Sequence, residues 1–318
     1  MDPGRVTRTD RLERILRALA TSLGPLEEAP TPLAGGITNH NFRVALGGQQ
    51  YVVRMHGQDT ELLGIDREAE RLASEAAASL GIAPAVAGAL DECLVTRYVA
   101  GALAGAADLA AHAPRIARAL RSFHDCGLEL PSRFAVPELL ERYARVVGER
   151  GGALPAAFAR VRELAARVAA ALAPARARPC HNDLLAGNIL LDEDATGITI
   201  VDWEYAGMGD PYFDLGNLSV NNDFDERADR LLLDAYLGGG ASDGALARLA
   251  LMRVLSDARE GAWGVVQAHV STLDFDFDFD GYARSHFERM LATAATDGFE
   301  EWLACASASR EERRGATA

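Results

Sequence analysis

Short apolar runs separated by turns dominate the first hundred residues and restrict this part of the chain to a small β-structure. Residues 41–46 and 51–55 flank a glycine turn at 47–50 and predict a β-hairpin. One helix is predicted among the strands, from Asp66, a favourable N-cap, to Leu80, because apolar residues recur there at helical spacing. The first part of the chain is therefore expected to form a small sheet-based lobe.

The residues after Gly101 have a different pattern. Their Ala, Leu and Arg content predicts long helices, for example over residues 108–124 and 154–172. A second predicted hairpin, residues 189–191 and 198–201, lies among these helices. Strands first and helices later predict an α+β fold with a small sheet lobe, a larger, mainly helical lobe, and a crevice between them where ligands bind.

The charge balance excludes several classes of function. Acidic residues outnumber basic residues 46 to 32, so the net charge is −14, which argues against nucleic acid or an anionic membrane as the main partner. A cationic or metal-bound partner suits that charge better. All 32 basic residues are arginine, so the chain has no lysine for a GxxxxGK[ST] phosphate loop or for Schiff-base chemistry.

Cysteine usage and hydropathy give expectations about location. Four cysteines without a CxxC pair indicate neither a disulfide framework nor a structural zinc site, so a reducing, cytoplasmic setting is expected. No apolar run approaches the roughly 20 residues that a membrane-spanning helix needs. The start of the sequence, MDPGRVTRTD, lacks the apolar stretch of a secretory signal, so neither export nor membrane insertion is expected.

The residues with the clearest chemistry surround the second hairpin. Asp183, in the sequence HNDLLAGN, is followed by Asn188, and the hairpin ends at Asp202. Because antiparallel strands return to their starting point, Asn188 and Asp202 are expected to lie side by side. Their oxygen atoms suit Mg²⁺ held on the phosphates of a nucleotide, and a neighbouring carboxylate can accept the proton of an attacking hydroxyl. The spacing follows the kinase pattern H-R-D-x-x-x-x-N and indicates phosphoryl transfer.

Several segments together resemble one known family. HNDLLAGNILL and the later ITIVDWEYAGMGDPYFDLGN are similar to the choline/ethanolamine kinase branch of the aminoglycoside phosphotransferase-like superfamily, whose fold is protein-kinase-like. REGAWGVVQAHVSTLDFDFDFDGYA resembles the C-terminal region of the same branch. Further matches lie at residues 35–44, 51–57 and 65–70. The resemblance implies a two-lobed kinase-like fold and ATP-dependent phosphorylation of a hydroxyl group on a small molecule.

The same resemblance implies roles on the nucleotide side. Arg54 stands where most kinases place a lysine on the phosphates, and a planar guanidinium binds phosphate oxygens in a bidentate manner. Glu70 is the expected partner of Arg54, with Glu68 as the alternative. The implied catalytic base and the two implied Mg²⁺ ligands are Asp183, Asn188 and Asp202. The other implied nucleotide-binding residues belong to a phosphate-covering turn and to a hinge that reads adenine: Gly35, Gly36, Thr38, Asn39, Arg97 and Val99.

The substrate side departs from the family pattern. Choline kinases of animals line the site of the quaternary ammonium with a Trp-x-x-Trp pair and a tyrosine, which make cation–π contacts. Trp263 and Tyr282 match the second tryptophan and the tyrosine. Glu260 occupies the place of the first tryptophan, and Asn221 replaces a carboxylate. A glutamate beside one tryptophan can bind a primary amine through hydrogen bonds or a quaternary amine through charge alone. The predicted substrate site comprises Glu204, Tyr205, Glu260, Trp263 and Tyr282.

A small cationic amino alcohol of the choline or ethanolamine type is the expected acceptor, with two alternatives. The same fold can phosphorylate an aminoglycoside, thiamine or another hydroxyl compound, and a nucleotide-binding regulator without catalysis would share the architecture. A monomer or a homodimer is expected. The predicted divisions are a nucleotide-binding lobe, a hinge, a catalytic and substrate-binding lobe, and an unstructured tail: residues 1–95, 96–101, 102–306 and 307–318.

One further segment resembles a calcium-binding loop but has a simpler interpretation. Residues 276–281 copy the start of a calcium loop, D-x-D-x-D-G, but the twelfth position is Phe287 rather than glutamate. Phe277 and Phe279 alternate with the acids, which predicts an extended segment with one buried face.

Overall fold

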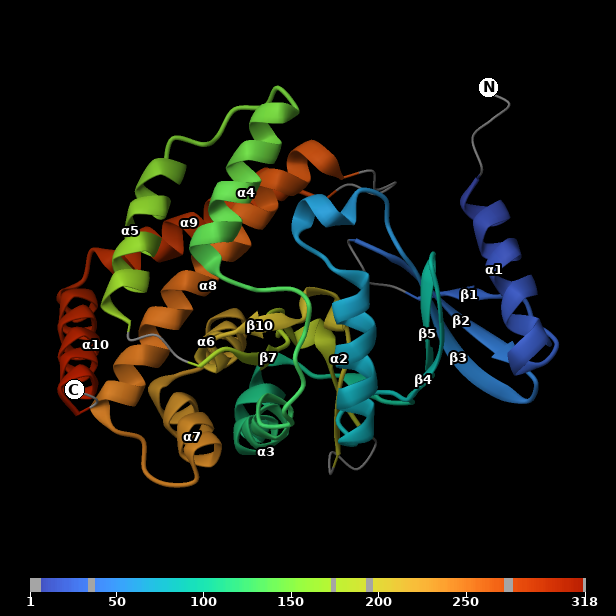
Figure 1. Ribbon diagram of the computed structural model, residues 1–318, viewed down its shortest axis with the longest axis horizontal. Coiled ribbons are helices and arrows are strands. Elements are labelled where there is room, and N and C mark those ends of the chain that lie inside the picture. Colours follow the sequence, from blue (N-terminus) through green and yellow to red (C-terminus); the bar gives the residue numbers. More distant parts are fainter. Residues whose placement is uncertain (1–6, 34–37, 173–175, 193–196, 272–276, 317–318) are drawn as a thin grey trace.

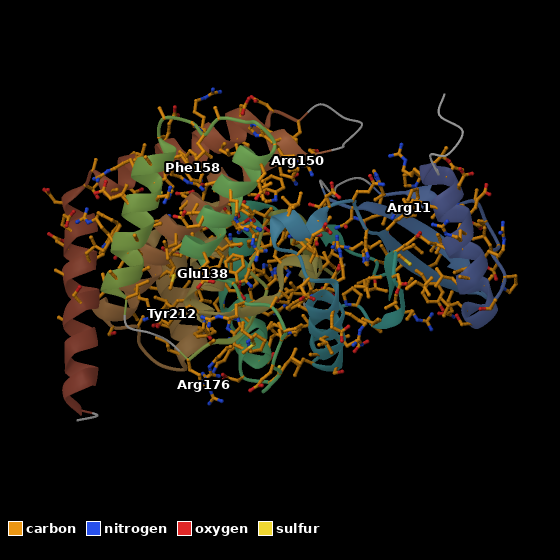
Figure 2. All side chains as sticks on the ribbon, turned by 45° about the horizontal axis from the view of Figure 1, so that its top comes forward. Arg11, Glu138, Arg150, Phe158, Arg176 and Tyr212 are labelled. Atoms are coloured by element: carbon orange, nitrogen blue, oxygen red, sulfur yellow. The ribbon has the colours of Figure 1, made fainter. Side chains whose placement is uncertain are left out.

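A small β-sheet packs beside a larger body of helices in the computed structural model of the protein (Figure 1). In Figure 2, Arg11 marks the helix on the sheet side of the molecule and Phe158 marks the opposite, helical side. The expected α+β arrangement is confirmed. The structure describes residues 7–33, 38–172, 176–192, 197–271 and 277–316.

The first sheet is antiparallel, with the strand order β1-β2-β3-β5-β4. Its strands are β1 (Thr31–Pro32), β2 (His40–Leu46), β3 (Gln49–Met55), β4 (Val86–Leu90) and β5 (Cys93–Arg97). The predicted hairpin is β2–β3, where Gly47 and Gly48 form the turn with φ angles of 54° and 76°. Positive φ at both central residues matches the twist of the flanking strands, and glycine adopts it without steric cost.

Helix α1 (Arg8–Leu23) covers one face of this sheet and is absent from the sequence prediction. Thr7 and Asp10 form a capping box at its start, in which each side chain accepts a hydrogen bond from the backbone N–H of the other. Ile15, Leu16 and Leu19 pack against apolar residues of the strands. The T-x-x-D pattern and the apolar spacing are the sequence signals that identify this helix.

Helix α2 (Arg67–Ser79) follows a 3-10 turn, η1 (Thr60–Leu63), and is capped as predicted by Asp66. The Asp66 carboxylate accepts the backbone N–H groups of Glu68 and Ala69, each at 3.0 Å. An N-cap of this kind contributes about 1 kcal/mol to helix stability. The cap fixes where the helix begins and therefore which of its carboxylates faces the interior.

The remaining helices form the larger part of the molecule, and most of them pack around α8 (Figure 1). They are α3 (Ala106–His124), α4 (Val136–Glu149), α5 (Phe158–Ala171), α6 (Pro211–Asn221), α7 (Glu226–Leu237), α8 (Asp243–Val270), α9 (Phe279–Ala294) and α10 (Asp297–Ala316). Helix α8 packs against α4, α6, α9 and α10, so most of its side chains are buried. In the part of the chain that the structure describes, no helix has the length and apolar character needed to cross a membrane.

The second predicted hairpin is confirmed as β8 (Ile189–Leu191) and β9 (Ile198–Ile200). It forms a three-stranded sheet with β6 (Ala102–Leu103). A separate antiparallel pair consists of β7 (Arg178–Cys180) and β10 (Gly207–Gly209). Because β7 pairs with β10, the loop after β7 lies beside the segment that connects β9 to β10.

Two helix boundaries differ from the sequence expectation. Helix α5 begins at Phe158 instead of Leu154, because Leu154 precedes Pro155 and the residue before a proline disfavours the helical conformation. The expected unstructured tail from residue 307 is corrected to helix, since α10 continues to Ala316. The alanine, arginine and glutamate residues of this segment have high helix propensity.

The segment of alternating aspartate and phenylalanine also differs from its prediction. It is helical from Phe279 onward rather than extended. Asp278 caps this helix by accepting the N–H of Gly281 at 2.8 Å, which is the structural role of part of the calcium-like pattern. Asp276 lies outside the described residues.

Candidate active site

A cavity of about 600 Å³ lies between the first sheet and the helices. Most of the predicted site residues line it: Thr38, Arg54, Glu70, Arg97, Val99, Asp183, Asn188, Asp202, Glu204, Tyr205, Glu260, Trp263 and Tyr282. Asn39 is buried behind this lining, and Gly35 and Gly36 lie outside the described residues. The fold thus collects in one cavity residues that are far apart in the chain.

The second hairpin places Asn188 and Asp202 beside each other. The N–H of Val201 donates to the Asn188 carbonyl at 2.9 Å, so the residue after Val201 faces the residue before β8. Nδ2 of Asn188 donates to the Asp183 main-chain carbonyl at 2.8 Å and to Oδ2 of the same residue at 3.2 Å. The structure therefore brings these three predicted residues together.

Two residues at this point have left-handed backbone conformations. Asn182 and Asp202 each have a φ angle of 67°. Asparagine and aspartate adopt this region more readily than other residues with a side chain, because their short polar groups bond locally. Nδ2 of Asn182 donates to the Tyr205 carbonyl at 3.0 Å, which fixes the loop conformation. Conformations of this kind cost about 1–3 kcal/mol and cluster at functional sites.

Two side chains of α6 hold the loop that follows β7. The Asp214 carboxylate accepts the backbone N–H groups of His181 at 2.8 Å and of Asn182 at 2.7 Å. Oδ1 of Asn217 accepts the N–H of Leu184 at 2.5 Å. The loop is therefore anchored on both sides of the residue that it presents to the cavity.

A buried cluster behind the loop has the composition of a metal site, but hydrogen bonds already occupy it. The ligand atoms of His124, Cys180 and Asp214 lie within 4.8 Å of one another. His124 uses both ring nitrogens, one with Tyr236 Oη at 2.8 Å and one with Asp214 at 2.9 Å. Burial raises the pKa of the Cys180 thiol well above its ordinary value, so this group is protonated. We assign this cluster to support of the loop.

Arg54 on β3 lies between two carboxylates. Its Nη1 contacts the Asp202 carboxylate and lies 3.5 Å from Oε1 of Glu70. Burial would raise the pKa of Asp202, but the Arg54 charge and hydrogen bond lower it below its ordinary value. Glu68, the alternative partner from the sequence, is exposed and pairs with Arg71 at 2.7 Å. Glu70 is therefore the glutamate beside Arg54.

Arg67, at the start of α2, joins the site although it is absent from the sequence prediction. Its Nη1 lies 2.7 Å from Oε2 of Glu70 and 3.3 Å from Oε2 of Glu204. Its Nη2 donates to Oδ1 of Asn39 at 3.0 Å, and Asn39 donates to Glu204 at 2.7 Å. Burial, together with the charge of Asp202, raises the pKa of Glu204 to about 7. The side chains of Asn39 and Glu204 thus bond to each other across the two halves of the molecule.

Glu260 on α8 forms the acidic end of the cavity. Its Oε1 accepts hydrogen bonds from Arg259 at 2.8 Å, Asn217 at 3.2 Å and Asn221 at 3.5 Å. Its Oε2 accepts the hydroxyl of Tyr282 at 2.8 Å. Burial would raise the pKa of Glu260, but the Arg259 charge lowers it, so the group is ionised. Four donors use nearly all of the acceptor capacity of a carboxylate.

Aromatic side chains form the wall next to Glu260. The ring centroids of Trp263 and Tyr282 are 5.7 Å apart, and those of Phe277 and Tyr282 are 5.8 Å apart. Nε1 of Trp263 donates to Oη of Tyr205 at 2.8 Å. An aromatic wall beside an ionised carboxylate suits a cation, because the negative faces of the rings attract positive charge.

Asp183 lies where the nucleotide-side residues and the aromatic wall meet. Its Oδ1 accepts a hydrogen bond from Nη1 of Arg259 at 2.9 Å. Burial raises the pKa of Asp183, the Arg259 charge opposes this, and the result is a pKa of about 7. Arg259 is 1% exposed, and its guanidinium carbon lies 4.4 Å from the centroid of the Tyr205 ring. Arg259 is the second site residue that the sequence prediction lacks.

The other end of the cavity is mainly apolar and suits a planar base. Its lining includes Val52, Ala83, Leu94, Val99, Leu190 and Val201. The Arg97 guanidinium donates to Gln49 at 2.7 Å and stacks 4.8 Å from the centroid of the Tyr51 ring. The side chain of Arg97 is therefore held by two residues of β3.

A sheet and a helical body that enclose acidic and amide oxygen donors in this arrangement define the class of kinase-like phosphotransferases. The sequence pattern of the phosphotransferase enzyme family (APH) matches residues 30–252. A choline/ethanolamine kinase family protein from Mesorhizobium loti is 31% identical, and its structure covers 95% of this chain and 99% of that chain with a TM-score of 0.76. The chain belongs to the phosphotransferase enzyme family, in its choline/ethanolamine kinase branch.

Two further proteins are similar to this chain. Probable choline kinase 1 of Arabidopsis thaliana is 25% identical over 323 residues, which cover 87% of this chain and 92% of the relative. LicA, whose structure is known in complex with AMP, is 24% identical in sequence and shares the fold. The superposition covers 91% of this chain and 98% of that chain with a TM-score of 0.69. The family, the protein-kinase-like fold and the phosphotransferase activity expected from the sequence are confirmed.

Proposed function

We propose that the protein transfers the γ-phosphoryl group of ATP to the hydroxyl of a small cationic amino alcohol of the choline or ethanolamine type. One observation carries the proposal. A single cavity has an apolar end suited to a base, an anionic aromatic end suited to a cation, and Asp183 between them. The names of the relatives, choline kinase and choline/ethanolamine kinase family protein, support the same acceptor class.

The donors at the second hairpin fit Mg²⁺. Asn188 and Asp202 offer hard oxygen ligands from adjacent positions and line the same cavity. Asp202 is ionised because Arg54 lowers its pKa, as a metal ligand requires. When bound there, Mg²⁺ supplies charge neutralisation on the phosphate oxygens. Arg54, directed at the same point, can add a bidentate contact to those oxygens.

Asp183 is the proposed proton acceptor. The acceptor oxygen forms a bond to the γ-phosphorus, and the bond between that phosphorus and the β–γ bridging oxygen breaks, so ADP leaves. The O–H bond of the acceptor breaks as well, and its proton moves to the Asp183 carboxylate. The transition state of phosphoryl transfer is loose, so Asp183 has to orient the hydroxyl more than it has to act as a strong base. His181 supports this geometry, since its Nδ1 accepts the N–H of Asp183 at 3.2 Å and its Nε2 lies 2.9 Å from the Val201 carbonyl.

The hydrogen bonds of Glu260 favour a quaternary ammonium over a primary one. A primary ammonium brings three N–H donors that need acceptors, whereas Glu260 already receives four donors. A quaternary ammonium needs only negative potential and aromatic faces, which Glu260, Trp263 and Tyr282 provide. Choline is therefore the preferred acceptor in this proposal.

The test is ADP formation from ATP and Mg²⁺ with choline, ethanolamine, thiamine or an aminoglycoside as acceptor. We expect the highest kcat/KM with choline, a lower value with ethanolamine, and the acceptor-free rate with the other two. Phosphorylation of thiamine or the aminoglycoside, with both amino alcohols inactive, establishes the alternative acceptor class. Nucleotide binding without acceleration by any acceptor establishes the non-catalytic regulator.

A further inference from the structure

One buried nitrogen joins the two acidic groups at the acceptor end of the cavity. Nη1 of Arg259 donates to Oδ1 of Asp183 at 2.9 Å and to Oε1 of Glu260 at 2.8 Å. This nitrogen carries two hydrogens, so it can serve both carboxylates at once. The Arg259 side chain is 1% exposed and packs on the Tyr205 ring, so the arginine itself is buried.

The bridge limits the distance between the two ends of a bound acceptor. The two carboxylate oxygens can be no farther apart than the two hydrogen bonds laid end to end. Asp183 is the group that would receive the hydroxyl proton, and Glu260 lies under the aromatic wall that would hold the cation. The separation between Asp183 and Glu260 therefore corresponds to the separation between the hydroxyl and the nitrogen of the acceptor.

The remaining donors of Arg259 indicate a role beyond stabilising the fold. Nε and Nη2 are buried and have no hydrogen-bond partner among the described residues. Buried donors without partners are costly, and replacing a buried ion pair by apolar residues often leaves stability unchanged or improves it. An arginine at this position is thus better explained by the geometry that it imposes on Asp183 and Glu260 than by its contribution to stability.

A second contact makes the geometry rigid. Asn217 donates to Oε1 of Glu260 at 3.2 Å and accepts the N–H of Leu184, the residue after Asp183, at 2.5 Å. The loop and α8 are therefore linked twice, once through Arg259 and once through Asn217. Two links between the same elements fix a distance better than one, as a preorganised site requires.

We propose that Arg259 is a positioning residue that sets the length of the acceptor. It does so by bridging Asp183 and Glu260, so that a two-carbon amino alcohol reaches both ends of the site and a three-carbon homologue does not. This inference rests on the function proposed above. An additional methylene lengthens the acceptor by roughly 1 Å, since carbon–carbon bonds are roughly 1.5 Å long. A misplacement of roughly 1 Å at the reacting atoms can cost about 100-fold in rate.

The experiment compares choline with its three-carbon homologue, (3-hydroxypropyl)trimethylammonium, in two variants of different design. Arg259→Lys keeps the charge but loses the planar group that stacks on Tyr205. The double variant Arg259→Met with Glu260→Gln removes one charge of each sign, so it breaks the bridge without changing the net charge of the site. Arg253→Met is the matched control, because Arg253 lies on the same helix and pairs with Asp229 at 2.6 Å.

The expected result is a loss of discrimination between the two acceptors. In both variants kcat for choline falls by about 100-fold, kcat for the homologue falls much less, and the ratio of the two kcat/KM values drops by about tenfold or more. The control keeps the wild-type ratio. Equal losses for both acceptors, or an unchanged ratio in a variant that binds ATP normally, overturn the role of Arg259. A wild-type protein that phosphorylates neither compound overturns the proposed function instead.

Discussion

Three arginines hold the carboxylates of the site, and each contacts two of them. Arg54 lies against Asp202 and Glu70. Arg67 bridges Glu70 and Glu204 in the same way, and Arg259 bridges Asp183 and Glu260. A guanidinium presents its donors in a fixed planar fork, whereas an ammonium is a compact point charge. Arginine can therefore set the spacing of two acids as well as neutralise them.

This difference predicts the effect of a lysine at position 54. Arg54→Lys keeps the charge but loses bidentate contact with phosphate oxygens and the double contact to the acids. We expect the KM for ATP to rise about tenfold, which corresponds to about 1.4 kcal/mol. Initial rates as a function of ATP concentration measure this KM, and Arg43→Lys on the neighbouring strand is the control. An unchanged KM would show that Arg54 does not bind the nucleotide.

Asp183 gives the second prediction at this scale. Asp183→Asn preserves the shape of the side chain but removes the proton acceptor, so kcat should fall about 10²- to 10⁴-fold. ATP affinity, measured by titration calorimetry, should stay within twofold, because the nucleotide contacts lie on other residues. The exposed Asp91→Asn serves as control and should leave kcat unchanged. A variant with near-normal kcat would exclude Asp183 from the reaction.

The sequence could identify Asp183, Asn188 and Asp202 because a single hairpin brings them together. Their spacing and the antiparallel pairing are local properties, so the pattern carries the geometry. Arg67 and Arg259 could not be found in that way. Each has one acid partner far away in the chain, Glu204 at 137 residues from Arg67 and Asp183 at 76 residues from Arg259, and only the packing of α2 and α8 brings these pairs into contact.

At the level of elements, both hairpins and α2 follow from local signals, namely period-2 apolar runs, glycine turns and an aspartate cap. The end of α10 and the start of α9 do not follow from such signals, since polar composition alone does not separate a helix from a loop. Phe279 is an example: its alternation with aspartates has the period of a strand, yet Asp278 caps a helix there. Capping overrides an apolar period over so short a segment.

The anchoring of the loop by α6 predicts a pH-dependent stability. Asp214→Asn removes the charge that accepts two backbone N–H groups, so the free energy of unfolding at pH 7 should fall by about 3 kcal/mol, as for a broken buried pair. Burial would raise the pKa of Asp214, but the hydrogen bond from His124 lowers it. A lowered folded-state pKa means that the stabilisation is present above the ordinary aspartate value of about 3.9 and is lost as the pH falls through the lowered one.

Urea unfolding at pH 7, 5 and 3 measures this dependence. The difference in the free energy of unfolding between wild type and Asp214→Asn should be the same at pH 7 and at pH 5, and it should be smaller at pH 3. Asp243→Asn, at an exposed helix start, should change stability by less than about 0.5 kcal/mol throughout. A difference that is constant across the three pH values would show that the charge of Asp214 is not what anchors the loop.

For the whole molecule, the cavity lies between the sheet and the helical body, and polar contacts join the two parts beside it. Tyr143 Oη donates to the Leu63 carbonyl at 2.8 Å, and Arg150 pairs with Asp59 at 3.2 Å. A ligand in the cavity that touches both parts adds its binding energy to these contacts. Nucleotide binding should therefore stabilise the molecule as one unit.

That argument gives a prediction about Mg²⁺. A ligand at about 100 times its Kd adds about 2.7 kcal/mol to the free energy of unfolding, so ATP with Mg²⁺ should raise Tm by several degrees. ATP with EDTA should raise it less, because Asn188 and Asp202 then contribute no metal contact. In Asp202→Asn the shifts with and without Mg²⁺ should become equal, since the variant lacks the ionised ligand. For each protein, the change in Tm on adding ligand is measured against the same protein without ligand. The stability that Asp202→Asn loses with the Arg54–Asp202 pair is therefore subtracted. Thermal unfolding measures these changes in Tm, with Asp91→Asn as the control variant. A Mg²⁺-dependent change in Tm that persists in Asp202→Asn would place the metal elsewhere.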